Sequence, residues 1–138
     1  MRVAPLVLIV EDEPALQRSM QRGLEQRGFH VRTAFDCRKA LSQLEGPAPD
    51  VICIDVCLPD QSGYELCEHV RRTPACAGVP ILVMGDKAFP EHMAHAEHAG
   101  ANGFLKKPFR IEDLVHWIES LLDGSPASFT SAHLLRRP

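Results

Sequence analysis

The chain has 138 residues, of which 45% are hydrophobic and 24% are charged, a balance typical of one globular domain with its own core. Nothing in its formal net charge of −3 indicates a basic surface, so we expect no direct binding of nucleic acid and no attachment to an anionic membrane. The apolar runs are too short for a membrane span or a signal peptide, so we expect a cytoplasmic protein.

Short apolar runs alternate along the chain with helical patterns. In chain order we predict a strand at 6–10, a helix at 14–27, a strand at 30–34, a helix at 38–44, a strand at 51–54, a helix at 63–72, a strand at 81–84, a helix at 91–99, a strand at 103–105 and a helix at 111–122. Pro14 suits a first helical turn and Gly28 suits a helix stop. The strand at 30–34 is less apolar than the others, which indicates the edge of a sheet.

Five strands that alternate with five helices predict an α/β fold. Its sheet should be parallel and doubly wound, with helices on both faces and right-handed crossovers. We expect residues 1–122 to form this domain. Residues 123–138 are rich in Gly, Ser, Pro and Ala, which is typical of a flexible tail or of the start of a truncated linker.

Three carboxylates and one ammonium group follow strands of the predicted sheet. Glu11 and Asp12 come directly after the first strand, Asp55 after the third and Lys107 just past the fifth. Open parallel sheets bind ligands at the carboxyl ends of their strands, so these groups should converge at one edge. Crowded carboxylates favour a bound cation, and hard oxygen ligands suit Mg²⁺. Asp55 is the nucleophile that this pattern favours, although Asp12 alone could be only a helix cap.

Three motifs resemble those of response regulator receiver domains. They are Val-Leu-Ile-Val-Glu-Asp-Glu-Pro at 7–14, Asp-Val-Cys-Leu-Pro-Asp-Gln-Ser-Gly at 55–63 and Gly-Phe-Leu-Lys-Lys-Pro-Phe at 103–109. The likeness covers residues 5–122. It implies a flavodoxin-like receiver fold with strand order 2-1-3-4-5, and a phosphorylated signalling protein of the bacterial two-component type.

The resemblance also implies roles for particular residues. Glu11, Asp12, Asp55 and the backbone carbonyl of Cys57 would hold Mg²⁺. Asp55 would accept phosphate from a histidine of a sensor kinase or phosphotransfer protein, and Lys107 would pair with that phosphate. A downstream protein target or effector domain would bind the face formed by the fourth helix, the fifth strand and the last helix.

One position departs from the family pattern. Receivers usually carry Thr or Ser directly after the fourth strand, where the hydroxyl binds phosphate, but here Gly85 stands there and Asp86 follows it. Phe104 occupies the position of the family's switch aromatic, and it could equally be an ordinary core residue. Without the hydroxyl, the usual coupling of phosphate to Phe104 cannot operate, so we expect an atypical or absent switch.

Two other functions compete with the phosphorylated receiver. Gly85 and Asp86 motivate a receiver-like interaction module that no longer switches. A phosphohydrolase with an aspartyl nucleophile is less favoured, because such enzymes carry a second Asp where this chain has Cys57. We therefore expect no enzymatic turnover.

The remaining features receive ordinary interpretations. The five cysteines form no Cys-x-x-Cys pair and are expected to be reduced thiols. His92, His95 and His98 recur every three residues, which makes a metal site or a pH-sensitive partner surface imaginable, although a mostly solvated helix face is favoured. Trp117 is expected to pack against the fourth helix, with partial exposure as an interface anchor the alternative.

Overall fold

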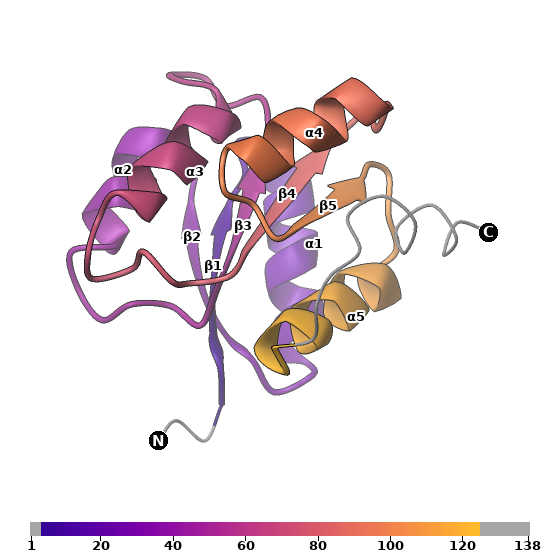
Figure 1. The fold of residues 1–138 in the computed structure, drawn as a ribbon. Helices are drawn as coiled ribbons and strands as arrows, with labels where there is room; N and C mark the ends of the chain where they lie inside the picture. Colours follow the sequence, from indigo (N-terminus) through magenta and orange to yellow (C-terminus); the bar gives the residue numbers. More distant parts are fainter. Residues whose placement is uncertain (1–3, 125–138) are drawn as a thin grey trace.

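Five parallel strands form the sheet at the centre of the computed structural model, which describes residues 4–124 (Figure 1). In the order β2-β1-β3-β4-β5, the strands are His30–Ala34, Leu6–Val10, Val51–Asp55, Ile81–Gly85 and Gly103–Lys106. The doubly wound α/β fold and the strand order are as predicted. The least apolar strand, β2, lies at an edge, also as predicted, and no residue of β1, β3 or β4 is exposed to solvent.

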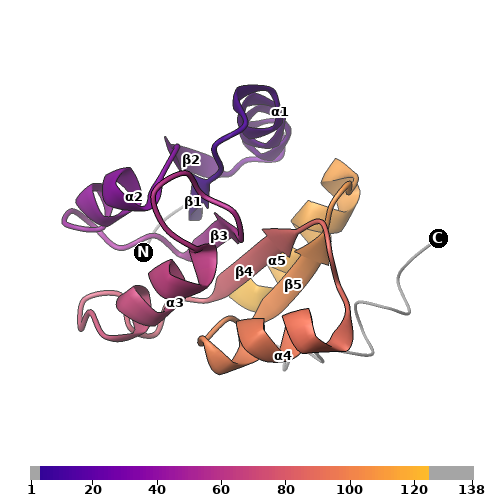
Figure 2. The same cartoon turned by 90° about the horizontal axis from the view of Figure 1, so that it is seen from above.

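The five helices of the described residues divide between the two faces of the sheet (Figure 2). One face is covered by α1 (Pro14–Glu25) and α5 (Ile111–Leu122). The other is covered by α2 (Cys37–Gln43), α3 (Gly63–Arg71) and α4 (Pro90–His98). No helix among residues 4–124 is long and apolar enough to cross a membrane.

Side chains of each central strand alternate between two hydrophobic clusters, one on each face of the sheet. In β1, Val7 and Ile9 belong to the cluster beneath α1 and α5, whereas Leu8 and Val10 belong to the cluster beneath α2, α3 and α4. Each face therefore has its own core, and the strands between them need apolar side chains in both directions.

The expected contact between Trp117 and α4 is wrong. Trp117 is 5% exposed and lies in the cluster beneath α1 and α5, across the sheet from α4. It packs on Gly103 at the start of β5, where an added Cβ atom would lie 2.6 Å from Cζ3 of the indole ring. The partial exposure considered for an interface anchor is absent as well.

The predicted element boundaries differ from the observed ones by at most two residues. Asp55 and Gly85 are the last residues of β3 and β4, whereas we expected them just after these strands. The first helix ends at Glu25, two residues earlier than expected, and Gly28 then takes a positive φ of 91°. The predicted tail over 123–138 lies outside the described residues from 125 onward.

A carboxylate from a distant loop caps α2. The Asp60 side chain accepts hydrogen bonds from the backbone N–H groups of Cys37 and Arg38, each at 3.0 Å. Asp36, the helix's own N-cap, accepts from the backbone N–H of Lys39 at 2.8 Å. Together the two carboxylates satisfy three donors that the helix itself leaves without partners. Asp60 thereby fastens the β3–α3 loop, which begins at the phosphoacceptor candidate, to α2.

One guanidinium group joins three segments at the opposite end of the sheet. Arg71, at the end of α3, donates to the backbone oxygens of Ala77, Val79 and Gly100 at 2.7–2.9 Å. It also donates to Oδ1 of Asn102, which in turn accepts from the backbone N–H of Ile81. Arg71 therefore holds the entry to β4 and the α4–β5 connection against α3.

Candidate functional site

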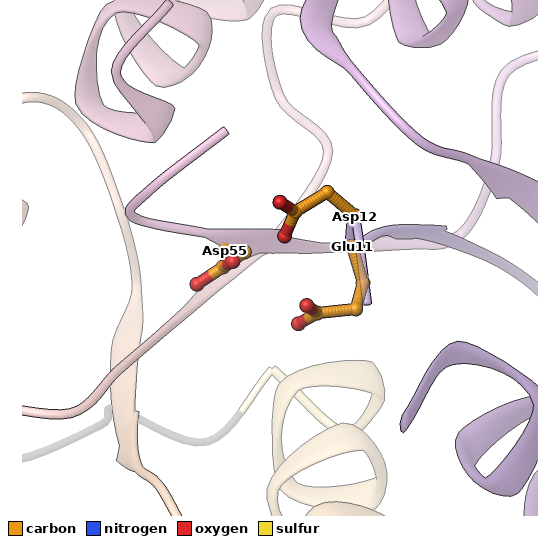
Figure 3. A group of neighbouring side chains, drawn as sticks. All are labelled: Glu11, Asp12 and Asp55. Carbon is orange, nitrogen blue, oxygen red and sulfur yellow. The ribbon is translucent and has the colours of Figure 1, made fainter. Parts of the chain in front are cut away.

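The predicted acids and lysine meet at the carboxyl edge of the sheet. Figure 3 shows Glu11 and Asp12 at the end of β1 beside Asp55 at the end of β3, and one oxygen of each carboxylate lies within 4.8 Å of the other two. Lys107 Nζ lies 2.9 Å from Glu11 Oε1 and 3.2 Å from Asp55 Oδ1. Because β1 and β3 are parallel neighbours, residues that end these strands come together without any special loop geometry.

Backbone contacts fix the two loops that carry the acids. The backbone N–H of Glu11 donates to Ala34 O at 3.0 Å, and the buried Gln17 side chain donates to Glu11 O at 2.9 Å. On the other loop, the N–H of Gly63 donates to Val56 O at 2.7 Å. A Cβ atom at Gly63 would collide with the backbone oxygen of Asp55, so α3 can begin here only with glycine. The carboxylates are therefore presented from rigid positions.

Asp12 does not serve as the helix cap that was its alternative interpretation. The residue at the N-cap of α1 is Glu13, and its side chain makes no capping hydrogen bond. The Asp12 side chain is exposed at the mouth of the acidic group, whereas Glu11 and Asp55 are buried. An exposed carboxylate beside two buried ones leaves a solvent-facing side on which water could complete a metal's ligands.

Burial dominates the ionisation of the two inner carboxyls. It raises the pKa of Glu11 above its usual 4.5, more than the hydrogen bond from Lys107 lowers it, and the charge of Asp55 raises it further. Burial likewise raises the pKa of Asp55 above its usual 3.8, more than Lys107 lowers it. For Lys107, burial lowers the pKa, but its bonds to the two carboxylates raise it by more, so the ammonium stays charged. The single positive charge of Lys107 therefore does not balance the negative charges of the carboxylates.

The donor set fits Mg²⁺. Three carboxylates offer the hard oxygen ligands that this ion prefers, and a second cation would supply the charge that Lys107 alone does not. Among residues 4–124 this is the one group of three or more acidic, histidine or cysteine side chains close enough together to share a metal ion. The histidines of α4 form no such group within the described chain. His95 instead stacks on Tyr64, with ring centroids 3.9 Å apart.

A pocket of about 500 Å³ opens beside the acids. Gly85 and Asp86 line it from the end of β4, and Asp86 is exposed there. Phe104 is fully buried, and its ring lies beside the space that a side chain at position 85 would need. A Cβ atom at Gly85 would lie 3.2 Å from Cζ of Phe104 and 3.0 Å from Cγ2 of Val56.

Several residues that line the pocket were not assigned to this site from the sequence, among them one from α3 and one from α4. Tyr64 of α3 and His92 of α4 both line the pocket that holds Asp55 and Lys107. His92 was noticed only as part of the histidine pattern, and nothing in the sequence directed attention to Tyr64. Cys57 also lines the pocket and is the one exposed cysteine, whereas the other four are buried, and all five are free thiols.

The sequence matches a family model described as the response regulator receiver domain over residues 7–119. The chain belongs to the response regulator receiver family. This receiver is 31% identical to the chemotaxis response regulator CheY4 of Vibrio cholerae, whose solved structure superimposes with a TM-score of 0.83. The superposition covers 86% of this receiver and 99% of that chain.

Two curated relatives show how the receiver occurs in longer proteins. This receiver is 34% identical to the response regulator MprA of Mycolicibacterium vanbaalenii over 116 residues. The aligned residues make up 84% of this receiver and 49% of the relative. This receiver is also 31% identical to the phosphate regulon transcriptional regulatory protein PhoB of Escherichia coli over 120 residues. Those residues make up 87% of this receiver and 52% of the relative. The receiver thus spans about half the length of these relatives, which are regulators by name.

Proposed function

We propose that this receiver is a phosphoacceptor of two-component signalling and that Asp55 takes the phosphoryl group from a histidine of a sensor kinase or phosphotransfer protein. The observation that carries the proposal is the position of Asp55. It lies 3.2 Å from Lys107 and shares a group of three carboxylates at the carboxyl edge of the sheet. Membership of the receiver family supports the same function.

In the proposed step, a carboxylate oxygen of Asp55 attacks the phosphorus of a phosphohistidine. A P–O bond forms as the P–N bond breaks, and the imidazole leaves with the bonding electrons. Lys107 would stabilise the charge on the phosphoryl oxygens from its place beside Asp55. Glu11, Asp12, Asp55 and the backbone carbonyl of Cys57 would hold Mg²⁺. When bound, the ion supplies further positive charge to the same oxygens.

The experiment that tests the proposal is the intact mass of the protein after incubation with Mg²⁺ and a small-molecule phosphodonor such as acetyl phosphate. We expect one added phosphate on the wild type, lost on mild alkaline treatment, and none on Asp55→Asn or without Mg²⁺. The absence of any adduct on a wild type that binds Mg²⁺ would contradict the proposal. An adduct on Asp55→Asn would place the phosphate on another residue.

We further propose that the phosphorylated form signals through a protein partner on the surface of α4, β5 and α5, by a switch that does not use a hydroxyl after β4. Gly85 offers an incoming phosphoryl group only its backbone, and Phe104 already lies buried against it. The route from phosphate to this surface therefore differs from one that begins with a threonine or serine side chain.

The same packing favours a second candidate, a receiver that binds its partner regardless of phosphorylation. If Phe104 stays inward in both states, the surface of α4, β5 and α5 changes little. Amide NMR spectra with and without Mg²⁺ and beryllofluoride separate the two candidates, since beryllofluoride mimics the phosphoryl group. Shifts that reach α4 and α5 support the switch, whereas shifts confined to the loops around Asp55 support the constitutive module.

A further inference from the structure

A buried nitrogen without a hydrogen-bond partner belongs to His92, a residue that lines the pocket beside Asp55. Nδ1 of His92 is shielded from solvent, and it is the one such side-chain nitrogen among residues 4–124 that lacks a partner. A buried polar atom left in this state costs about 1–3 kcal/mol. Most buried polar atoms in folded proteins have a hydrogen-bond partner, so a buried nitrogen without one is a candidate for binding a ligand.

His92 is held in place by contacts that do not use its ring nitrogens. The hydroxyl of Tyr64 donates to the backbone oxygen of His92 at 3.5 Å, and the Tyr64 ring stacks on His95 one turn further along α4. The ring of Phe89 lies against the His92 imidazole, with centroids 5.6 Å apart. These contacts hold His92 at the wall of the pocket that also contains Asp55 and leave its ring nitrogens unused.

Carboxylates outnumber the cationic side chains that line the pocket. Five carboxylates line it, those of Glu11, Asp12, Glu13, Asp55 and Asp86. The ammonium of Lys107 is already paired with two of them. Lys87 is exposed on the β4–α4 loop, and β4 itself contributes only the backbone of Gly85. Phosphorylation of Asp55 would replace the single negative charge of its carboxylate with the two of a phosphoryl group, which adds one negative charge to this pocket.

We propose that His92 is a phosphoryl-binding residue: its imidazole turns toward the pocket when Asp55 is phosphorylated, and Nδ1 then donates a hydrogen bond to an oxygen of the phosphoryl group. It thereby supplies from α4 the donor that Gly85 does not supply from β4. The inference rests on the proposed phosphorylation of Asp55. It gives α4 a direct contact with the phosphoryl group, so phosphorylation acts on this helix without a hydroxyl and without movement of Phe104.

The test compares His92→Leu, which removes both ring nitrogens, with His92→Asn, whose amide N–H lies close to the position of Nδ1. His98→Leu is the matched control, because His98 is an exposed histidine on the same helix. Beryllofluoride is titrated into each protein at saturating Mg²⁺. The rate at which the phosphorylated proteins lose phosphate and the affinity for Mg²⁺ alone are measured in parallel.

We expect His92→Leu to bind beryllofluoride about tenfold more weakly, the effect of one lost hydrogen bond to a charged group, with no change in its affinity for Mg²⁺. We expect a shorter phosphate lifetime in that variant, with values close to wild type for His92→Asn and His98→Leu. In the wild type, the ¹⁵N resonance of His92 Nδ1 should shift when beryllofluoride binds, a signal that a purely structural role would not produce.

Wild-type affinity in His92→Leu, or an unmoved Nδ1 resonance in a wild type that binds beryllofluoride, would overturn the inference and leave the proposed function standing. Equal weakening in His92→Asn and His92→Leu would assign the residue to packing and overturn it as well. A wild type that takes up neither phosphate nor beryllofluoride would remove the proposed function and this inference together.

Discussion

The cap that Asp60 provides for α2 predicts a measurable loss of stability in Asp60→Ala. The carboxylate accepts hydrogen bonds from two backbone N–H groups of a seven-residue helix, and alanine would leave both without a protein partner. Loss of a capping side chain costs about 0.5–2 kcal/mol, and because Asp60 is exposed, water recovers part of the loss. We therefore expect the free energy of unfolding to fall by about 1 kcal/mol, with a melting temperature lower by roughly 3–5 °C.

The matched control is Asp36→Ala, which removes the other carboxylate from the same helix end. Urea denaturation followed by circular dichroism should show losses of similar size for both variants. Asp60 differs from Asp36 because it belongs to the β3–α3 loop, so only Asp60→Ala should also weaken the binding of Mg²⁺ at the neighbouring acids. Unchanged stability in Asp60→Ala would refute the capping argument, and equal effects on Mg²⁺ in both variants would refute the link to the loop.

The pH dependence of this loss has a definite sign. Burial raises the pKa of Asp60, but its hydrogen bonds, first those from the N–H groups of Cys37 and Arg38, together lower it by more, so the pKa lies below its usual 3.8. A lowered carboxyl pKa stabilises the fold above the unfolded value, and the contribution is lost as the pH falls through the folded value. The difference in the free energy of unfolding between wild type and Asp60→Ala should therefore have its full size at neutral pH and shrink below about pH 4. A difference that grows on acidification would contradict the assignment.

Three further outcomes are expected. Arg71→Ala should lower the free energy of unfolding by about 2–4 kcal/mol in urea denaturation, because a guanidinium that binds several carbonyls is lost, and a loss below about 0.5 kcal/mol would count against its joining role. Iodoacetamide should alkylate Cys57 alone in the native protein, since the other thiols are buried and burial raises the pKa of Cys53 to about 12; peptide mapping that finds Cys53 modified first would contradict this. Gly85→Thr should destabilise the fold by about 1–3 kcal/mol through crowding against Phe104, and Phe104→Leu in the same chain should recover part of that loss if the crowding is real.

The sheet could be predicted because its signals are local. Uniform apolar runs mark strands with both faces buried, and the less apolar run at His30–Ala34 marked the edge strand correctly. The ends of β3 and β4 were predicted one residue short. Asp55 and Gly85 are residue types that strands disfavour, yet the backbone pairing continues through Asp55 opposite Met84 and through Gly85 opposite Lys106. Backbone pairing, which propensity does not reveal, decided those boundaries.

The acidic group could be predicted for a different reason. Once the strands are parallel, the residues that follow them must share one edge, so the positions of Glu11 and Asp55 in the chain were enough to bring them together. The walls of the pocket could not be predicted in this way. Tyr64 and His92 approach the site only because α3 and α4 pack side by side, and helical periodicity says which residues turn inward but not which neighbour they meet.

Helical periodicity also fails to show the partners in two other contacts that the sequence did not reveal. The amphipathic pattern of α5 is consistent with a buried Trp117, but no strand of the sheet follows this helix among the described residues, so no crossover rule decides which face it covers. Asp60 caps a helix that begins 23 residues earlier in the chain, and no local pattern connects the two segments. Both contacts follow from tertiary structure.

The contact between Gly85 and Phe104 also restricts how this sequence can evolve. A hydroxyl-bearing residue at position 85 requires space that Phe104 and Val56 already fill. If position 85 enlarges first, the core is overpacked, and if Phe104 shrinks first, a cavity is left. The two substitutions are therefore epistatic, since neither is neutral without the other. Descendants of this sequence should retain the glycine, even where selection would favour a hydroxyl at this position.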